Sequence, residues 1–205
     1  ETQRSGDNDS MLCWPSSLAH RMLYLKTHNP SLKKLKLKSD PVENVAKFVK
    51  MCRTSASGGT SQKRKLPCIR EAFKEAGYSV DAFSVGPDGE KKRKVEIKDL
   101  ADNLKAGYAV ILHVAWWRPD GKNPNWKEAG SHSLNAYALE GNRLTVVNPG
   151  MEYSNRPAGK MYDTVDVQAL KRTPGISYPT NADLVISGPG FDQPNRLAVL
   201  KNIFV

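Results

Sequence analysis

Three side chains in the sequence, Cys13, His132 and Asn148, have the types needed for thiol chemistry on a carbonyl group. A cysteine attacks as the thiolate, and an imidazole forms that thiolate by accepting the thiol proton. An asparagine or aspartate side chain holds the imidazole in the tautomer that accepts this proton. The three residues therefore predict hydrolysis of an amide, with Cys13 as nucleophile, His132 as general base and Asn148 as the orienting group.

Cys13 is expected at the first turn of a helix. Apolar side chains recur every three or four residues over residues 13–26, and Pro15 falls in the first turn, where proline costs no internal hydrogen bond. The N-terminus of a helix carries partial positive charge, which favours a thiolate. The alternative is a thiol buried beneath this helix.

A β-hairpin is expected to bring His132 and Asn148 together. Alternating residues over 132–139 predict one strand, and residues 143–148 predict the returning strand after a tight turn at Gly141. His132 lies nine positions before Gly141 and Asn148 lies seven positions after it. The two side chains are therefore expected to be neighbours at one end of the hairpin.

The other three histidines are weaker candidates for the general base. His113 lies in the middle of an apolar run, where a histidine usually has a structural role. His20 falls on the helix of the nucleophile and His28 near its end, so both are expected to be structural or exposed.

The remaining two cysteines, Cys52 and Cys68, are expected to form a disulfide. Both fall on the apolar faces of successive predicted helices, and the polar residues 55–61 between them allow the chain to turn back. Such a bridge stabilises a fold by roughly 3 kcal/mol and indicates an oxidising compartment. The chain begins at Glu1 and shows no leader, so we expect a mature or trimmed protein, and the predicted bridge leads us to expect that it is secreted or periplasmic. The alternative is a pair of buried thiols.

Helices are expected in the first third of the chain and strands in most of the remainder. Further predicted helices are residues 41–52, 67–76 and 99–105, and further predicted strands are 78–85, 108–117, 162–167 and 197–205. Residues 118–130 and 172–190 are expected to be long loops. This order predicts the α+β class with an antiparallel sheet, in a single domain over residues 1–205 with a helical part to about residue 77 and a β part from about residue 78.

The chain is basic, with 31 Lys and Arg against 21 Asp and Glu and a formal charge of +10. Much of the excess lies in three runs, residues 33–38, 63–65 and 91–94, and it favours acidic partners such as a cell-wall polymer. Because aromatic residues are absent from these runs, specific binding of single-stranded nucleic acid is not favoured, and nucleic acid stays a weaker alternative.

Patterns typical of cofactor sites and membrane spans are lacking. No spacing of His and Cys resembles a zinc site, and no Gly-rich phosphate loop is present, so no metal or cofactor is expected. No apolar stretch approaches the roughly 18 to 20 residues of a bilayer-spanning helix, so no membrane span is expected either.

The motifs around the three candidate residues resemble those of papain-like cysteine peptidases. They are Cys13-Trp14-Pro15-Ser16-Ser17, Gly130-Ser131-His132 and Val146-Val147-Asn148-Pro149, in the same order of Cys, His and Asn. They are most similar to the bacterial branch related to bacteriocin-leader peptidases. The resemblance implies a papain-like fold, in which an N-terminal helical lobe with the nucleophile helix packs on an antiparallel β-sheet lobe. It also implies a peptide or protein substrate in the cleft.

One position departs from the papain-like pattern. These peptidases place a glutamine about six residues before the cysteine, where its side chain donates a hydrogen bond to the oxyanion, and Asp7 stands there in this chain. Asn8 or Gln3 would have to supply that donor, beside the backbone N–H of Cys13. Loss of such a donor weakens catalysis by about two to three orders of magnitude.

Two further functions fit the same motifs. A cell-wall amidase or endopeptidase would use the same cysteine and histidine, and the basic charge and predicted secretion suit it. A catalytically inactive papain-like module that binds a peptide would explain Asp7 at the glutamine position. A third hypothesis, polyanion binding through the lysine runs, predicts an affinity that falls steeply with salt.

Overall fold

The computed structural model describes residues 11–120, 123–148, 162–172, 174, 178, 183–192 and 195–205. Contacts within the chain divide it into two compact units, of which the first extends to Phe83 and the second begins at Ser84. The candidate oxyanion donors Asn8 and Gln3, together with Asp7, lie outside the described residues.

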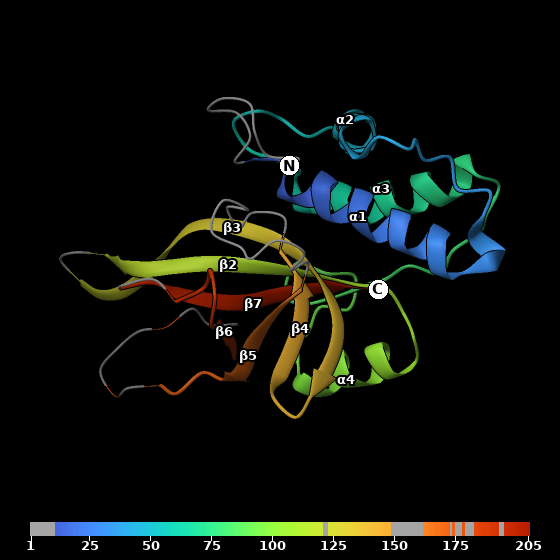
Figure 1. Cartoon of the computed structure of the whole chain (residues 1–205). Helices are drawn as coiled ribbons and strands as arrows, with labels where there is room; N and C mark the ends of the chain where they lie inside the picture. Colours follow the sequence, from blue (N-terminus) through green and yellow to red (C-terminus); the bar gives the residue numbers. More distant parts are fainter. Residues whose placement is uncertain are drawn as a thin grey trace. The chain divides into compact units, whose positions relative to one another are not determined.

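The first unit is helical (Figure 1). Its elements are α1 (Cys13–His28), the short 3-10 helix η2 (Pro30–Leu32), α2 (Pro41–Met51) and α3 (Gln62–Glu75). The predicted start of α2 is confirmed, because the side chain of Asp40 accepts a hydrogen bond of 2.8 Å from the backbone N–H of Val42 and Pro41 occupies the first helical position. The predicted helix at Cys13 is confirmed as well, and it continues to His28.

Helix α3 begins at Gln62, five residues before the predicted start at Pro67. Proline inside a helix removes one backbone hydrogen bond, which is why the sequence suggested a start there. Lys65 and Leu66 are buried in this first part of the helix, so packing offsets the cost of the proline. Cys68, which follows Pro67 in α3, forms the predicted disulfide with Cys52.

The core of the first unit is built from the inner faces of its helices, with α1 packed on α2 and α2 on α3. Its largest fully buried side chains are Trp14, Leu18, Met22, Leu35 and Phe48. Burying an aliphatic or aromatic side chain of this size contributes about 1.5 to 3 kcal/mol. The disulfide joins the end of α2 to α3 and closes a segment of 16 residues.

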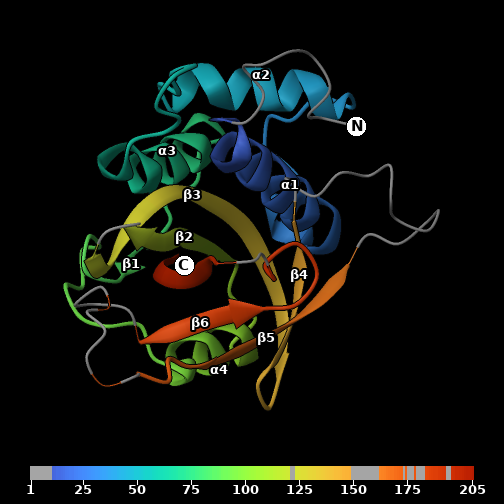
Figure 2. The same ribbon diagram turned by 90° about the vertical axis from the view of Figure 1, so that its left-hand side faces the viewer.

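The second unit is a closed β-barrel with one helix. Its elements are β1 (Ser84–Val85), α4 (Ile97–Lys105), β2 (Val110–Asp120), β3 (Asn123–Glu140), β4 (Arg143–Val147), β5 (Asp163–Ala169), β6 (Leu184–Ser187) and β7 (Leu197–Phe204). The strands are antiparallel in the order β1-β7-β2-β3-β4-β5-β6, and β6 also pairs with β7. Six strands therefore form a closed barrel and β1 lies outside it. Figure 2 shows β3, β4, β5 and β6 curving round toward β7.

One continuous face of this sheet is the interior of the barrel. On β5 the residues alternate between buried and exposed, with Asp163, Val165 and Val167 buried. Their register partners on β4 are buried as well, with Val146 opposite Asp163 and Leu144 opposite Val165. Strict alternation of this kind places every second side chain inside a closed sheet.

The predicted fold class is wrong. We expected an α+β, papain-like arrangement in which a helical lobe carrying the nucleophile helix packs on an antiparallel β-sheet lobe. The described residues instead form a closed six-stranded antiparallel barrel, one outside strand and four α-helices, which is a barrel fold.

Two segments that we predicted as loops explain the error. Strand β6 lies within residues 172–190, and it pairs with both β5 and β7, so it is the strand that closes the barrel. Residues 118–130 are also not a long loop, because their described part continues the hairpin of β2 and β3. The strand predicted over 78–85 is reduced to β1, the two residues Ser84–Val85.

Candidate active site

The centre of the candidate site in the second unit is a hydrogen bond between His132 and Asn148. The distance from His132 Nε2 to Asn148 Oδ1 is 2.5 Å. His132 is half-buried on β3, whereas Asn148, directly after β4, is 3% exposed. The amide is thus fixed by burial, and the imidazole it contacts is still open to solvent on one side.

The hairpin of β3 and β4 produces this contact through its register. Asn135 pairs with Val147 and Ala136 with Val146, and the register shifts by one residue between Ala136 and Ala138. Continuing this pairing by one residue places Asn148 opposite Leu134, two residues from His132 on the same face of β3. Diagonal neighbours on one face of an antiparallel pair are close enough for their side chains to meet.

The hydrogen bond determines the tautomer of His132. The amide oxygen of Asn148 can only accept, so the proton between the two residues belongs to Nε2 of the imidazole. In the neutral ring, Nδ1 then carries the lone pair and can accept a proton from another group. This is the arrangement that a general base requires.

Gly130, two residues before His132, is required by the backbone conformation. Its φ is +144°, in a region that residues with a side chain rarely adopt. The pairing of β2 and β3 also shifts between Trp116 and Trp117, opposite this part of β3. The strand is therefore irregular just before His132, and such irregularities often redirect a side chain.

Cys13 is the first residue of α1 in the first unit. It takes no part in a disulfide and is half-buried. Residue Leu12 precedes the helix without a capping side chain, and the first turn contains no acidic residue. The partial positive charge of the helix N-terminus is therefore not offset by a carboxylate of the same turn.

The other histidines are placed as the sequence predicted. His113 is 7% exposed in the middle of β2, between its register partners Ser133 and Asn202. Burial, and then the charge of Arg21, lower the pKa of His20 below its usual value. His20 is two helical turns from Cys13, a rise of roughly 10 Å, which is too far for direct proton transfer.

His28, at the end of α1, is exposed and stacks on a neighbouring ring. Its centroid lies 4.1 Å from that of Tyr24, and its Nδ1 donates a hydrogen bond of 2.9 Å to the Tyr24 carbonyl oxygen. A ring nitrogen that donates to a backbone carbonyl is not the acceptor that a thiol proton needs.

Asp163 is a polar residue near the pair that sequence reasoning missed. It is 4% exposed on β5, and it pairs with Val146, so it shares the inner face of the barrel with Asn148. The signal was available, since Asp163 occupies the inward position of an alternation that continues with Val165 and Val167. An acid at such a position is uncommon unless it is paired or functional.

The described residues form no metal centre and no helix that could span a membrane. No group of three or more His, Cys, Asp or Glu side chains has the geometry to hold a metal ion within the described ranges. None of the helices in the described part of the chain combines the length and the apolar character needed to cross a membrane.

No protein-family model matches the chain. The chain also matches no curated protein.

Proposed function

We propose that the protein is a thiol hydrolase of amide bonds, a cysteine peptidase in which Cys13 is the nucleophile, His132 the general base and Asn148 the orienting group. The observation that carries the proposal is the hydrogen bond from His132 Nε2 to Asn148 Oδ1, which leaves Nδ1 as the proton acceptor. The position of Cys13 at the N-terminus of α1 supports it. The proposal rests on this chemistry and does not need the fold that the sequence suggested.

The reaction would proceed in two halves. His132 Nδ1 accepts the thiol proton of Cys13, and the thiolate attacks the substrate carbonyl carbon. The C–N bond then breaks, the amine leaves with the proton from the imidazolium, and a thioester remains on Cys13. Water, deprotonated by His132, hydrolyses this thioester to a carboxylic acid and restores the thiol.

The helix that carries Cys13 would also stabilise the tetrahedral intermediate. The first amides of a helix have no acceptor within the helix, and the N–H of Cys13 is the first of α1. A negatively charged oxygen beside this N–H gains a hydrogen bond and the favourable end of the helix dipole. A second donor would come from Asn8 or Gln3.

Secretion belongs to the same proposal. The disulfide between Cys52 and Cys68 suits an oxidising compartment, such as the periplasm or the exterior of a cell. The substrate there would be a peptide or protein, or the peptide part of a cell wall if the enzyme is an amidase. Digestion of purified peptidoglycan beside an unstructured protein substrate would distinguish the two.

Trapping of the acyl-enzyme tests the proposal directly. The protein would be mixed with an activated ester such as p-nitrophenyl acetate, quenched in acid and mapped by mass spectrometry. We expect an early burst of nitrophenol and an acetyl group on Cys13, and neither in Cys13→Ala. His132→Ala should keep the thiol and lose the burst. Acetylation of Cys13 at equal rates in the wild type and His132→Ala would contradict the proposal.

A further inference from the structure

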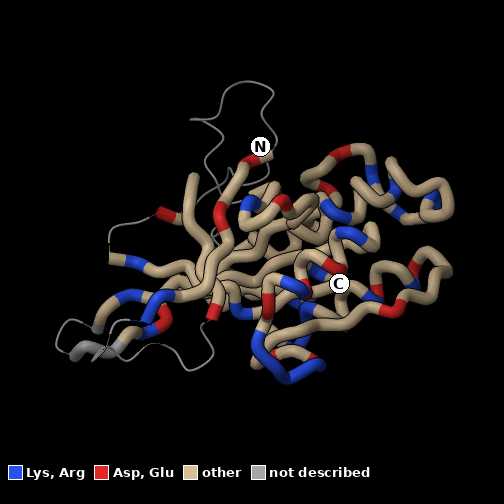
Figure 3. Tube along the Cα trace, turned by 90° about the horizontal axis from the view of Figure 1, so that it is seen from below, with Lys and Arg blue, Asp and Glu red and all other residues tan. Residues whose placement is uncertain are grey.

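The positive charge of the chain is concentrated in the first unit. Residues 11–83 contain 14 Lys and Arg against 5 Asp and Glu, which gives +9, whereas residues 84–205 contain 16 against 13, which gives +3. Residues 1–10 contain 1 against 3 and account for the remaining −2 of the total of +10. Figure 3 marks Lys and Arg in blue and Asp and Glu in red along the trace.

The largest group of these charges is residues 33–38, which we name the lysine segment. Its four lysines, Lys33, Lys34, Lys36 and Lys38, are exposed, whereas Leu35 between them is 2% exposed. The backbone N–H of Lys34 donates a hydrogen bond of 3.1 Å to Tyr78 Oη. The buried leucine and this bond attach the segment to the rest of the unit.

Helix α2 holds the other end of the lysine segment. Asn44 Oδ1 accepts a hydrogen bond of 2.8 Å from the N–H of Lys38, and Asn44 Nδ2 donates one of 2.9 Å to the carbonyl oxygen of Lys38. Lys47 Nζ donates a hydrogen bond of 2.7 Å to the carbonyl oxygen of Lys36. The backbone that presents the four ammonium groups is therefore ordered before any partner arrives.

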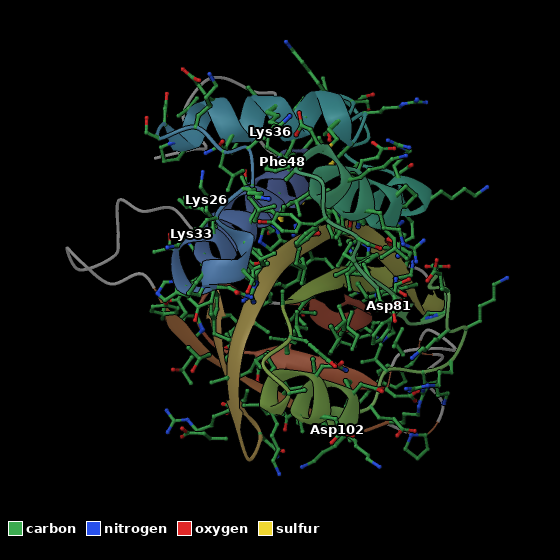
Figure 4. All side chains as sticks on the ribbon, turned by 90° about the vertical axis from the view of Figure 1, so that its right-hand side faces the viewer. Lys26, Lys33, Lys36, Phe48, Asp81 and Asp102 are labelled. Atoms are coloured by element: carbon green, nitrogen blue, oxygen red, sulfur yellow. A yellow bond between two sulfur atoms is a disulfide. The ribbon has the colours of Figure 1, made fainter. Side chains whose placement is uncertain are left out.

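Helix α1 contributes a further lysine to the same region. Lys26 Nζ lies 3.5 Å from the carbonyl oxygen of Leu37, within the segment. Figure 4 labels Lys26, Lys33 and Lys36, which lie along one side of the helical unit. An ammonium bound to a carbonyl oxygen keeps its full charge, so Lys26 adds to the positive potential here.

Acidic side chains do little to neutralise this charge. Asp40 caps the start of α2, Glu75 forms an ion pair with Lys47, and Glu43 lies 3.9 Å from Lys38. Across the ranges that the structure describes, the ammonium groups of the other three lysines of the segment form no ion pair and no hydrogen bond. Like charges held this close repel one another, so an anion bound there would relieve the repulsion.

We propose that the lysine segment binds the backbone of a phosphodiester polymer. Lysine ammonium groups act as point charges toward phosphate, and such contacts do not depend on the identity of a base. The segment presents no aromatic ring and no arginine, so stacking on bases has no support there. Its leucines face inward or are half-buried, so the segment offers no apolar side chain for insertion into a bilayer. These features favour a charged polymer chain over a membrane surface.

Binding to defined polymers tests the proposal. The probes are an oligo-dT single strand and poly(glycerol phosphate), with vesicles of phosphatidylserine and phosphatidylcholine as the competing class. Affinity would be measured by fluorescence anisotropy from low to moderate salt. The test variant is Lys33→Gln/Lys34→Gln/Lys36→Gln. The matched control is Lys92→Gln/Lys98→Gln/Lys105→Gln, which removes three exposed lysines from the second unit.

We expect both polymers to bind the wild type with similar affinity at equal charge, because only phosphates are contacted. The slope of log affinity against log salt should be about −3 for four neutralised phosphates and should fall toward about −1 in the test variant. Affinity at low salt should drop at least about tenfold in the test variant and much less in the control. Equal losses in the two variants, binding of vesicles alone or binding of neither polymer would overturn the proposal.

The two hydrogen bonds between the Asn44 side chain and the backbone of Lys38 offer a second test. Asn44→Ala removes both of its hydrogen bonds to Lys38 and leaves every charge in place. If the ordered backbone matters, affinity should fall several-fold while the salt slope stays the same. Circular dichroism would verify that the variant is folded. An unchanged affinity in a folded variant would contradict the role of the ordered segment.

Discussion

The two units of the chain differ in what holds them together and in which part of the proposed chemistry they carry. The first is a small set of helices joined by a disulfide, with most of the net positive charge and the thiol of Cys13. The second is a barrel closed by strand pairing, and it carries His132 and Asn148.

The difference shows how each architecture fixes a side chain. Small helical units bury too little apolar surface to be very stable, so a covalent bridge contributes much of what they need. A closed barrel leaves few unpaired strand edges and fixes register, so it can hold two side chains at hydrogen-bond distance. The proposed nucleophile thus depends on a helix end and the proposed base on strand register.

The largest expected effect concerns the side chains that would react. Cys13→Ala should lower amide or ester hydrolysis by about 10⁴-fold or more, and His132→Ala should cause a similar loss, because the two act as a unit. Steady-state kinetics would measure both, with circular dichroism as the control for folding. A Cys13→Ala protein that keeps more than a tenth of the activity would show that the thiol is not the nucleophile.

The next effect separates the stability of the two units. Replacing both cysteines of the bridge, Cys52→Ala/Cys68→Ala, should lower the free energy of unfolding of the first unit by about 3 kcal/mol, because the bridge closes a segment of 16 residues. Hydrogen exchange followed by mass spectrometry would report faster exchange in α1, α2 and α3 and unchanged exchange in β2 and β3. Equal loss of protection in the barrel would mean that the two units unfold together.

Replacing Asn148, the proposed orienting residue, should lower activity less than replacing Cys13 or His132. Asn148→Ala should lower kcat by about 100-fold with little change in KM, because the imidazole loses the partner that fixes its tautomer. Asn148→Asp offers the matched comparison, since a carboxylate oxygen can accept the same hydrogen bond and should retain more activity. If alanine and aspartate have the same effect, Asn148 has a packing role rather than an orienting one.

The smallest expected effect lies in the strand before the histidine. Gly130→Ala should lower the free energy of unfolding by about 1 to 2 kcal/mol, because its φ of +144° is unfavourable for a residue with a side chain. An added Cβ would meet no atom within 4 Å, so the effect is one of backbone strain alone. Chemical denaturation would measure it. If the variant loses activity under conditions in which it is still fully folded, the backbone conformation at Gly130 positions His132.

Local features of the structure were predictable from the sequence. Proline and aspartate at the start of α2, the apolar repeat of α1 and the turn at Gly141 act over a few residues, and the elements they predict are present. The pairing of Cys52 with Cys68 followed from two predicted helices and a polar connection. Asn148 lies beside His132 because the hairpin between them is also local.

The closure of the barrel was not predictable in the same way. Strand β6 has four residues, Leu184–Ser187, and its pairing with β7 has two register positions, Val185 with Val199 and Ile186 with Ala198. A run this short shows no periodicity that separates a strand from a helix, and the Pro and Gly residues around it favoured a loop. Asp163 was missed although its alternation with Val165 and Val167 was visible, because its register partner Val146 lies on another strand.

The central claim is that the imidazole of His132 activates the thiol of Cys13, and the rate of alkylation of Cys13 by iodoacetamide against pH tests it most directly. An ordinary thiol has a pKa of about 8.5 and reacts slowly near pH 6. We predict rapid modification confined to Cys13 near pH 6 in the wild type, and slow modification that rises only above pH 8 in His132→Ala. Identical profiles in the two proteins, or a Cys13 that reacts only after denaturation, would contradict the account.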